Sequence, residues 1–574
     1  MLKLGRHWSL ILGTVFVICL IPQAQSLVNL RTGNYNVSAT DVSYPGGYDF
    51  ELTRVYNSKS PFNGLFSWGW GNELELYLSL EADGSVVVHE YGGGMEIPFY
   101  PEGWSQKDLD AAIEELVGLA KKEGKLNSSA ALQDYKTKLQ TKSFFRAEEY
   151  ARFTKLKKIK PKVYQVGTKY RSERAPFQLI KSTATGYERV SDTGTVEKFN
   201  KLGQLFSIQL PNKHFISLTY KNGKLEKLVD SLNRKLFFTF NKKGHIERIE
   251  GEGKNVATYK YNANAELIQA KGFDGVTYQY EYSKDGYYNL QKISYDKPKP
   301  GKIEIQYHAT QGEFFHHVKS VKDADSSLTT YDYSKPRGAD SLKIAVAVKL
   351  PDSTNTFKSS YDYTLKTKPT GEEWIPKLVE DRQGVVTTKI YEEKSGYPIE
   401  IQRDTRSAKF TYDSIGRIVN KVTSDSRTKP AVQKTVQVSY DKATGKISEV
   451  TEDPSDEGKK ATTQYKYDTL GNLISARQDK DVVTMVYDKL NRMSTMVDGT
   501  GTRFDFTYDN ASRPITVSQK AKGSLKLSYD QQGNLIPPDT SSPGLSAISA
   551  DLERSNQTLR KLLEPAKIDF SGID

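Results

Sequence analysis

The sequence predicts a mainly β protein in which a ribbon of β-hairpins coils into a spiral shell or trough, with a small α-helical insertion near the N-terminus. Three features predict it: aromatic residues recur at a fixed interval, the chain alternates around them, and a short polar turn follows each. The interval is 20 or 21 residues in two runs of anchors, Phe199, Tyr220, Phe240, Tyr261 and Tyr282, and Tyr467, Tyr487, Tyr508 and Tyr529. Such a period indicates repeats of one supersecondary unit.

Each repeat has the pattern of one hairpin. The stretch Phe504-Asp505-Phe506-Thr507-Tyr508 alternates as a strand with one buried face does. An Asp after the anchor can bond the backbone two residues on, and a Gly then accepts the positive φ of a tight turn. The repeat motif is carried by Tyr412, Asp413, Gly416, Tyr440, Asp441, Gly445, Tyr467, Asp468, Gly471, Tyr487, Asp488, Tyr508, Asp509, Tyr529, Asp530 and Gly533.

Three turns depart from this pattern. Asn491 replaces the glycine after Tyr487, and Asn is the next best residue for a left-handed backbone. The turns that follow Tyr261 and Tyr508 have neither Gly nor Asn at this position, so we expect distorted hairpins there.

The number of repeats implies curvature. Anchors from Phe199 to Tyr529 give about 15 units, hence about 30 strands and on the order of 140 Å of ribbon. A twisted sheet rarely stays open beyond about 10 strands, so the ribbon must curl. The anchors between Tyr282 and Tyr391 are 25 to 30 residues apart, which predicts longer, projecting loops.

These motifs resemble the RHS/YD-repeat family, over roughly residues 195 to 536. A second stretch, Arg54-Val55-Tyr56-Asn57-Ser58 with Gly64-Leu65-Phe66-Ser67-Trp68-Gly69-Trp70, resembles the domain that commonly precedes such repeats. The resemblance implies a hollow shell of coiled hairpins, which encloses a C-terminal polypeptide in toxin systems and serves adhesion in eukaryotic cell-surface relatives. The expected domains are 27–194 with a helical insertion at about 104–160, the array 195–536, and 537–574 as a polar linker and short helix.

The C-terminal segment differs from toxin-bearing relatives. After Ile536 the chain is polar through Gly544, and a short amphipathic stretch runs from Ser549 to Leu563. We expect neither an effector domain nor the self-cleaving core segment of longer relatives.

The first 26 residues have the pattern of a signal peptide. Lys3 and Arg6 precede an apolar run, and small residues end it, which predicts cleavage after Ser26. Cys19, in this run, is the only cysteine; lipidation there is the minority interpretation because Ile18 precedes it. The mature chain would have no thiol, which excludes disulfides and cysteine nucleophiles.

The segment between the leading domain and the repeats has helical periodicity. Ser105 with Asp108 predicts a capped helix that ends at Gly124, and further helices are predicted around 129–139 and 143–158. Extended residues around it, 96–99 and 164–166, suggest that the insertion interrupts a β-domain. Its basic end, Lys155 to Lys162, could contact an anionic surface, but a solvated helix end is the preferred interpretation.

We expect no catalytic, cofactor-binding or metal-binding residues. His316 and His317, in a presumed strand, would face opposite ways and so could not chelate one ion. The repeated aspartates could form a carboxylate array, but identical spacing favours turn initiation. Most tyrosines should form core ladders, while a few exposed ones could stack on sugars.

The sequence therefore favours an exported, non-enzymatic scaffold of the cell envelope or surface. Its expected partners are a glycan or cell-envelope polysaccharide and a protein, with no nucleic acid and no integral membrane span. The alternative is a truncated or split shell of a toxin system that encloses a separately encoded partner.

Overall fold

The computed structural model describes residues 25–44, 50–92, 94–124, 126–141, 143–159, 165–172, 174–175, 178–191, 193–211, 213–297, 299–335, 340–367, 373–393, 396–427, 431–454, 459–510, 512–530 and 535–568. Residues 1–24 of the expected signal peptide, and Gly533, lie outside these ranges. The chain forms two compact units. We call Leu52–Tyr259 with Ala263–Ala265 the N-terminal unit, and the remaining described residues the C-terminal unit.

The N-terminal unit consists mainly of antiparallel strands, each paired with its neighbour in sequence from β7 to β19. The strands are β3 (Phe50–Asn57, from Leu52 on), β4 (Asn63–Gly64), β5 (Ser67–Trp68), β6 (Trp70–Asn72), β7 (Tyr77–Leu80), β8 (Val86–Glu90), β9 (Met95–Pro101), β10 (Lys169–Arg171), β11 (Leu179–Ser182), β12 (Gly186–Val190), β13 (Val196–Asn200), β14 (Leu205–Gln209), β15 (Phe215–Lys221), β16 (Lys224–Asp230), β17 (Lys235–Phe240), β18 (Ile246–Glu250) and β19 (Val256–Tyr261).

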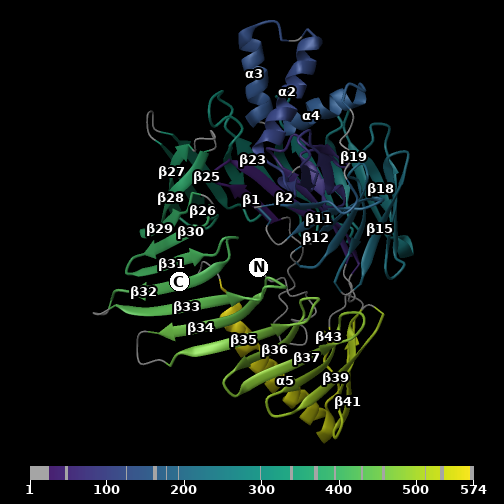
Figure 1. The fold of residues 1–574 in the computed structure, drawn as a ribbon, viewed down its shortest axis with the longest axis vertical. Helices are drawn as coiled ribbons and strands as arrows, with labels where there is room; N and C mark the ends of the chain where they lie inside the picture. The colour runs from purple at the N-terminus through teal and green to yellow at the C-terminus, as the bar shows by residue number, and fades with distance from the viewer. Residues whose placement is uncertain are drawn as a thin grey trace. The chain divides into compact units, whose positions relative to one another are not determined.

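The helical segment of this unit lies between two paired strands. Helices α2 (Gln106–Lys122), α3 (Ser129–Thr141) and α4 (Ser143–Lys155), labelled in Figure 1, follow β9 and precede β10. Tyr170 of β10 pairs with Pro101 of β9. The Ser105 amide donates to Asp108 at 2.8 Å, which caps α2 as its sequence predicts. The expectation that Val166 is extended is wrong, because it lies in a turn and the strand resumes only at Lys169.

A buried cation holds the leading hairpins of the N-terminal unit. The Arg54 side chain is fully buried, and its guanidinium carbon lies 4.8 Å from the Trp70 ring centre and 5.7 Å from those of Phe66 and Tyr259. Cation–π attraction of this kind is strongest where the cation is desolvated.

The C-terminal unit holds the rest of the array. Its strands are β1 (Gln25–Asn29), β2 (Asn34–Tyr44), β20 (Leu267–Lys271), β21 (Thr277–Tyr282), β22 (Leu290–Tyr295), β23 (Gly301–Tyr307), β24 (Val318–Lys322), β25 (Leu328–Ser334), β26 (Ser341–Lys349), β27 (Thr356–Thr367), β28 (Glu373–Arg382), β29 (Val385–Tyr391), β30 (Pro398–Arg403), β31 (Arg406–Tyr412), β32 (Ile418–Asp425), β33 (Val432–Tyr440), β34 (Ile447–Pro454), β35 (Ala461–Tyr467), β36 (Leu473–Gln478), β37 (Asp481–Tyr487), β38 (Met493–Asp498), β39 (Arg503–Tyr508), β40 (Pro514–Gln519), β41 (Gly523–Lys526), β42 (Ser528–Tyr529) and β43 (Leu535–Ile536).

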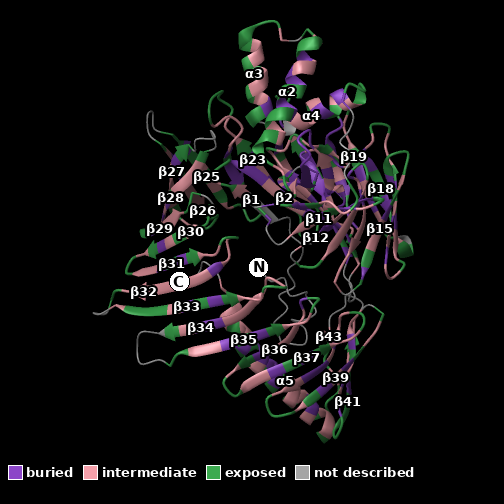
Figure 2. Ribbon diagram, viewed as in Figure 1, coloured by how far each residue is buried: buried purple, intermediate pink, exposed green. Residues whose placement is uncertain are grey.

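Every strand from β20 to β41 pairs antiparallel with the next one, so this unit is a continuous ribbon of hairpins. Burial alternates along many of these strands, and Figure 2 shows the mixed colours of buried and exposed residues along the ribbon. In β37, Val483 and Met485 are buried and Thr484 and Val486 are exposed. The inner face, which we define as the face that carries Val483 and Met485, is covered by helix α5 (Pro543–Leu563). No described helix combines the length and apolar character needed to span a membrane.

Candidate functional site

Most anchor residues lie at a β-bulge. The register shifts directly before Tyr412, Tyr440, Tyr467, Tyr487 and Tyr508, so the strand that follows each of these anchors accommodates one extra residue near its start. A bulge bends its strand and increases the local twist. Because the bulge recurs at the same position in these repeats, it bends the ribbon in the same way each time.

The anchor hydroxyl binds the preceding repeat. Tyr487 donates to the Leu473 carbonyl at 2.9 Å, and Leu473 is the aliphatic residue that ends the previous motif. The same bond joins Tyr440 to Ile418, Tyr467 to Ile447, Tyr508 to Met493, Tyr529 to Pro514, Tyr220 to Leu205, Tyr282 to Leu267, Tyr307 to Leu290 and Tyr412 to Pro398. The anchor tyrosine of one hairpin is thus hydrogen-bonded to the backbone of the preceding hairpin.

The motif aspartate organises its own turn. The Asp488 carboxylate accepts from the amides of Leu490 and Arg492, both at 2.9 Å, and from the Arg492 guanidinium at 2.8 Å. Although partial burial acts in the opposite direction, these hydrogen bonds lower the pKa of Asp488. Asp413, Asp468 and Asp509 make equivalent bonds, Asp441 binds Thr444, and Asp530 follows the anchor of the last repeat. In the described turns, the carboxylates of Asp413, Asp441, Asp468, Asp488 and Asp509 bind their own turn, the role that the spacing favours over a catalytic array.

The arginine that follows several turns contacts the next anchor. The Arg492 guanidinium carbon lies 4.7 Å from the centre of the Tyr508 ring, while its side chain holds Asp488. Arg417 stacks on Tyr440 and Arg513 on Tyr529 in the same way. One arginine therefore joins an aspartate of its own repeat to a tyrosine of the next, a contact that spacing alone does not reveal.

The turns after Tyr412, Tyr440, Tyr467 and Tyr487 each have a left-handed residue. Gly416, Gly445 and Gly471 have φ of 86°, 70° and 81°, and Asn491 has 61°. The expectation of distorted hairpins after Tyr261 and Tyr508 is wrong. Ala265 and Ser512 adopt φ of 69° and 64° there, and the turn-closing bonds Asn262 to Glu266 and Asp509 to Arg513 form as elsewhere. Backbone pairing of the flanking strands outweighs the local strain.

The longest loops of the ribbon gather aromatic side chains. We call Tyr287, Phe315 and His316 the aromatic loop cluster; they come from loops 283–289 and 308–317 of the C-terminal unit. The Tyr287 ring centre lies 4.2 Å from that of His316 and 5.3 Å from that of Phe315. Tyr287 is 56% exposed, whereas the anchor tyrosines are buried or half-buried.

Polar groups fix the Tyr287 loop. The Asp285 carboxylate accepts from the Ser283 hydroxyl at 2.5 Å and from the Tyr287 amide at 3.1 Å. Its other oxygen lies 4.0 Å from His316 Nδ1. Partial burial would raise the pKa of Asp285, but these contacts together lower it, so the group is ionised at neutral pH. An exposed aromatic ring can stack on a sugar ring, and an ionised carboxylate next to it can accept hydrogen bonds from the sugar hydroxyls.

The two adjacent histidines lie in loop 308–317 and not in a strand, so the premise of a strand is wrong. His316 contacts Tyr287, while His317 lies 5.1 Å from Tyr333, ring centre to ring centre. His316 has a φ of 59°, which turns the chain between the two rings. Across the described residues, no group of three or more His, Cys, Asp or Glu side chains is arranged to hold a metal ion.

A second polar cluster, in the N-terminal unit, was not found from the sequence. His89 Nε2 lies 2.8 Å from the Ser79 hydroxyl, which also donates to Glu81 at 2.9 Å, and His89 Nδ1 lies 3.5 Å from Glu96. Tyr77 stacks on the imidazole with 4.3 Å between ring centres. The imidazole is 5% exposed, so this row of cross-strand neighbours joins β7, β8 and β9 and offers no open nucleophile.

The remaining sequence-derived sites are at the surface or near the N-terminus. Lys158, in the basic end of the insertion, pairs with Glu123 at 2.7 Å, and Lys155 and Lys157 are exposed. Lys160 and Lys162 lie outside the described residues. Ser26, the expected cleavage position, lies in β1 and pairs with Val37, so cleavage there would leave Leu27–Asn29 of the strand.

Two family models match parts of the chain. Residues 25–99 match a model described as Domain of unknown function (DUF6531), and residues 352–543 match Teneurin YD-shell. The second match covers the strands in which tyrosine, aspartate and arginine recur with the geometry described above.

The chain carries RHS/YD repeats over the part that matches the shell model. No curated protein matches it significantly. Among solved structures, the Tc holotoxin pore of Photorhabdus luminescens aligns at 12% identity and a TM-score of 0.42, over 90% of this chain and 28% of that chain. The crystal structure of TcdB2-TccC3-TEV aligns at 11% and 0.43, over 92% and 29%. This YD-repeat chain thus spans less than a third of the length of those chains. Because both TM-scores are low, the fold assignment rests on the repeat geometry and not on these alignments.

Proposed function

We propose that this YD-repeat protein is an exported, non-enzymatic scaffold of the cell envelope or surface, and that it binds carbohydrate through the aromatic loop cluster. The observation that carries the proposal is the exposed Tyr287 ring beside the ionised carboxylate of Asp285. Both sit on a loop that is closed by the Ser283 amide to the Asn289 carbonyl at 2.8 Å. A pre-formed loop loses little conformational entropy when a ligand binds.

The site supports shallow binding rather than deep enclosure. The side chain of Tyr287 is 56% exposed and lies on a loop. Weak contacts of this kind become useful when a polymer offers many copies of the same sugar, because binding then gains from effective concentration. A cell-envelope polysaccharide is a ligand of that type.

A glycan array probed with residues 27–574 tests the binding. Tyr287→Ala should reduce binding at least tenfold, and Tyr287→Phe should keep most of it because the stacking face remains. Phe357→Ala, at a 39% exposed ring on β27, is the matched control and should change little. Wild-type binding no higher than background, or undiminished binding by Tyr287→Ala, would contradict the proposal.

Export is tested separately by N-terminal sequencing of the protein from a bacterial envelope fraction. A mature chain that starts at Leu27 is the expected result. A chain that retains Met1 and stays in the cytoplasm would overturn this part of the proposal.

A further inference from the structure

The C-terminal segment crosses the inner face of the ribbon. Helix α5 packs against β41, β40, β37 and β36, and the short 3-10 helix Glu564–Ala566 that follows packs against β34. Ile568, further along, contacts the cluster around Phe410 of β31. The Tyr465 hydroxyl donates to the Leu562 carbonyl at 2.6 Å, which fixes the end of the helix. Residues 543–568 therefore lie across the strands as one strap.

The surface under the helix is rich in methionine. Met485, Met493 and Met496 are buried in the cluster that also contains Ile548, Leu559 and Leu562 of α5. The whole sequence has five methionines, and three of them lie in this surface under α5, which we call the seat. Methionine side chains are unbranched and polarizable, and surfaces built from them adapt to more than one apolar partner.

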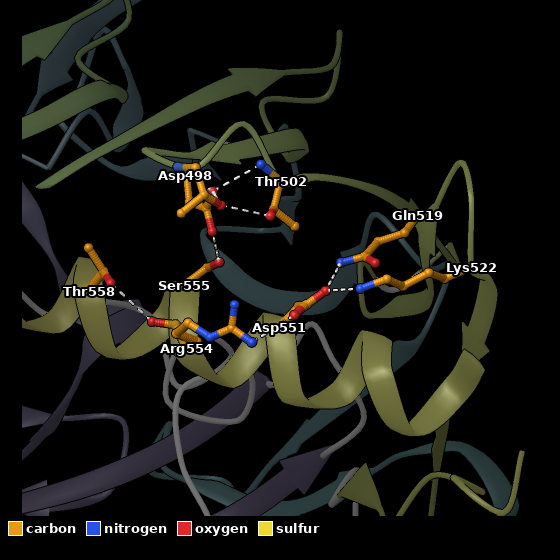
Figure 3. A network of polar contacts seen from close by, with 9 residues as sticks. Asp498, Thr502, Gln519, Lys522, Asp551, Arg554, Ser555 and Thr558 are labelled. Atoms are coloured by element: carbon orange, nitrogen blue, oxygen red, sulfur yellow. Dashed lines mark hydrogen bonds and ion pairs between the residues drawn. The ribbon is translucent and has the colours of Figure 1, made fainter. Parts of the chain in front are cut away.

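Polar contacts define how a helix must lie in the seat (Figure 3). Ser555 donates to the Asp498 carboxylate at 2.6 Å, and the Gln519 amide donates to Asp551 at 3.2 Å, where Lys522 also pairs. Ser555 is 1% exposed, so its hydrogen bond to Asp498 is shielded from water. These contacts sit on the same helix face as the apolar residues and fix the register.

The attachment of the strap is of a kind that can be reversed. It joins the ribbon through Pro537-Pro538-Asp539-Thr540-Ser541-Ser542, a polar linker without a helix or strand. Its pair between Lys561 and Asp481 is exposed, and exposed ion pairs contribute little. Most helical stability in proteins comes from the packing of an amphipathic face, so the helicity of α5 depends on the seat.

We propose that the inner face of β36–β41 is a receptor for an amphipathic helix of a partner polypeptide, and that α5 occupies it as an internal ligand until the partner replaces it. The partner helix would match α5: apolar residues at the positions of Ile548, Leu552, Leu559 and Leu562, a small hydroxyl residue at the position of Ser555, and a carboxylate four residues before it. A tethered segment competes at high effective concentration, so the partner must bind more tightly than α5 does. This inference is independent of carbohydrate binding.

Peptide exchange tests the proposal. A protease site inserted between Pro538 and Asp539 of the full chain allows the linker to be cut while every residue is retained. A fluorescent peptide of residues 542–568 should then bind the cut protein saturably and release the native segment. The peptide with Leu559→Asp should bind at least tenfold more weakly, whereas Gln557→Asp, the same charge on the exposed face, should bind like wild type.

Hydrogen exchange on the uncut protein provides a second measurement. Amides of α5 should exchange at least tenfold faster than those of β37, because the strap leaves while the ribbon stays folded. Equal protection, no peptide exchange over days, or unfolding of β36–β41 on release would overturn the proposal and make the strap a fixed support. A dimer that exchanges α5 between two copies would also overturn it.

Discussion

The hydroxyl of an anchor tyrosine is the smallest group on which the repeat geometry depends. Tyr487 donates to the Leu473 carbonyl of the preceding repeat, and burial raises the pKa of the equivalent Tyr467 to about 12. A hydroxyl that is both bonded and withdrawn from water contributes in two ways, because its loss removes one bond and leaves a carbonyl without its partner.

Tyr487→Phe should therefore lower the free energy of unfolding by about 1 kcal/mol in urea titrations. Tyr287→Phe is the matched control, because the Tyr287 ring is exposed, and should change it by less than about 0.5 kcal/mol. An equal effect of the two substitutions would show that the ring-to-backbone bond is not made.

Glu81 predicts a pH dependence of stability. Burial raises the pKa of Glu81 to about 7, and the residue is 2% exposed. The unfolded chain ionises near pH 4.3, whereas the folded chain keeps the proton to about pH 7. The stability that Glu81 gives is thus full below pH 4.3 and is lost as pH rises to about 7.

Glu81→Gln, which keeps an acceptor for Ser79, should remove this dependence. The free energy of unfolding of the wild type, relative to that of the variant, should fall by on the order of 2 to 3 kcal/mol between pH 4.5 and 7. Urea unfolding at each pH measures this difference. The exposed Glu115→Gln is the control. Parallel curves for wild type and Glu81→Gln would rule out a buried protonated carboxyl.

At the residue scale the sequence predicts more of the repeats than of the candidate site. The aspartate and glycine roles follow from local backbone chemistry and can be read from one repeat. The partners of Tyr487 and Arg492 lie in neighbouring hairpins, so they depend on the stacking distance. Tyr287 and His89 gave no signal, because exposure and cross-strand neighbours depend on the register of several strands.

Glycines test the turns at the scale of the element. Gly471 has a φ of 81°, which an L-residue with a side chain adopts only with strain, so Gly471→Ala should destabilise by about 1 kcal/mol or more. Gly118 lies in helix α2, and a methyl group there meets no atom within 4 Å. Gly118→Ala should stabilise by about 0.5 to 1 kcal/mol.

Thermal unfolding of both variants measures whether Gly471→Ala lowers and Gly118→Ala raises the stability of the protein. A stabilising Gly471→Ala would mean that the turn does not need a left-handed residue, contrary to the account of the motif.

Elements with strong periodicity are predictable, and those set by tertiary contacts are less so. The helices near residues 106, 129 and 143 occur where amphipathic spacing and the Ser105 cap place them. Helix α5 begins at Pro543, six residues before the expected start, because Ser542 caps it and accepts from the Leu545 amide at 3.4 Å. Pro after Ser is a helix-start signal that the apolar spacing alone does not show.

At the scale of the whole molecule, the repeat period implies a continuous ribbon, and pairing from β20 to β41 agrees. The period says nothing about which segment covers the inner face, because α5 is far from most of its contacts in sequence. It also does not identify a ligand or partner, which depend on loops and helices outside the repeat.

Disulfide formation tests the central claim, that successive repeats stack in one register, most directly. Cys19 is the only cysteine, so residues 27–574 give no background. Ser475 of β36 and Thr484 of β37 are cross-strand partners, at a spacing that allows a disulfide, whereas Val486 lies two residues further along β37 on the same face. Ser475→Cys with Thr484→Cys should oxidise readily and Ser475→Cys with Val486→Cys should not; the reverse result would contradict the register and with it the coiled ribbon of tied hairpins.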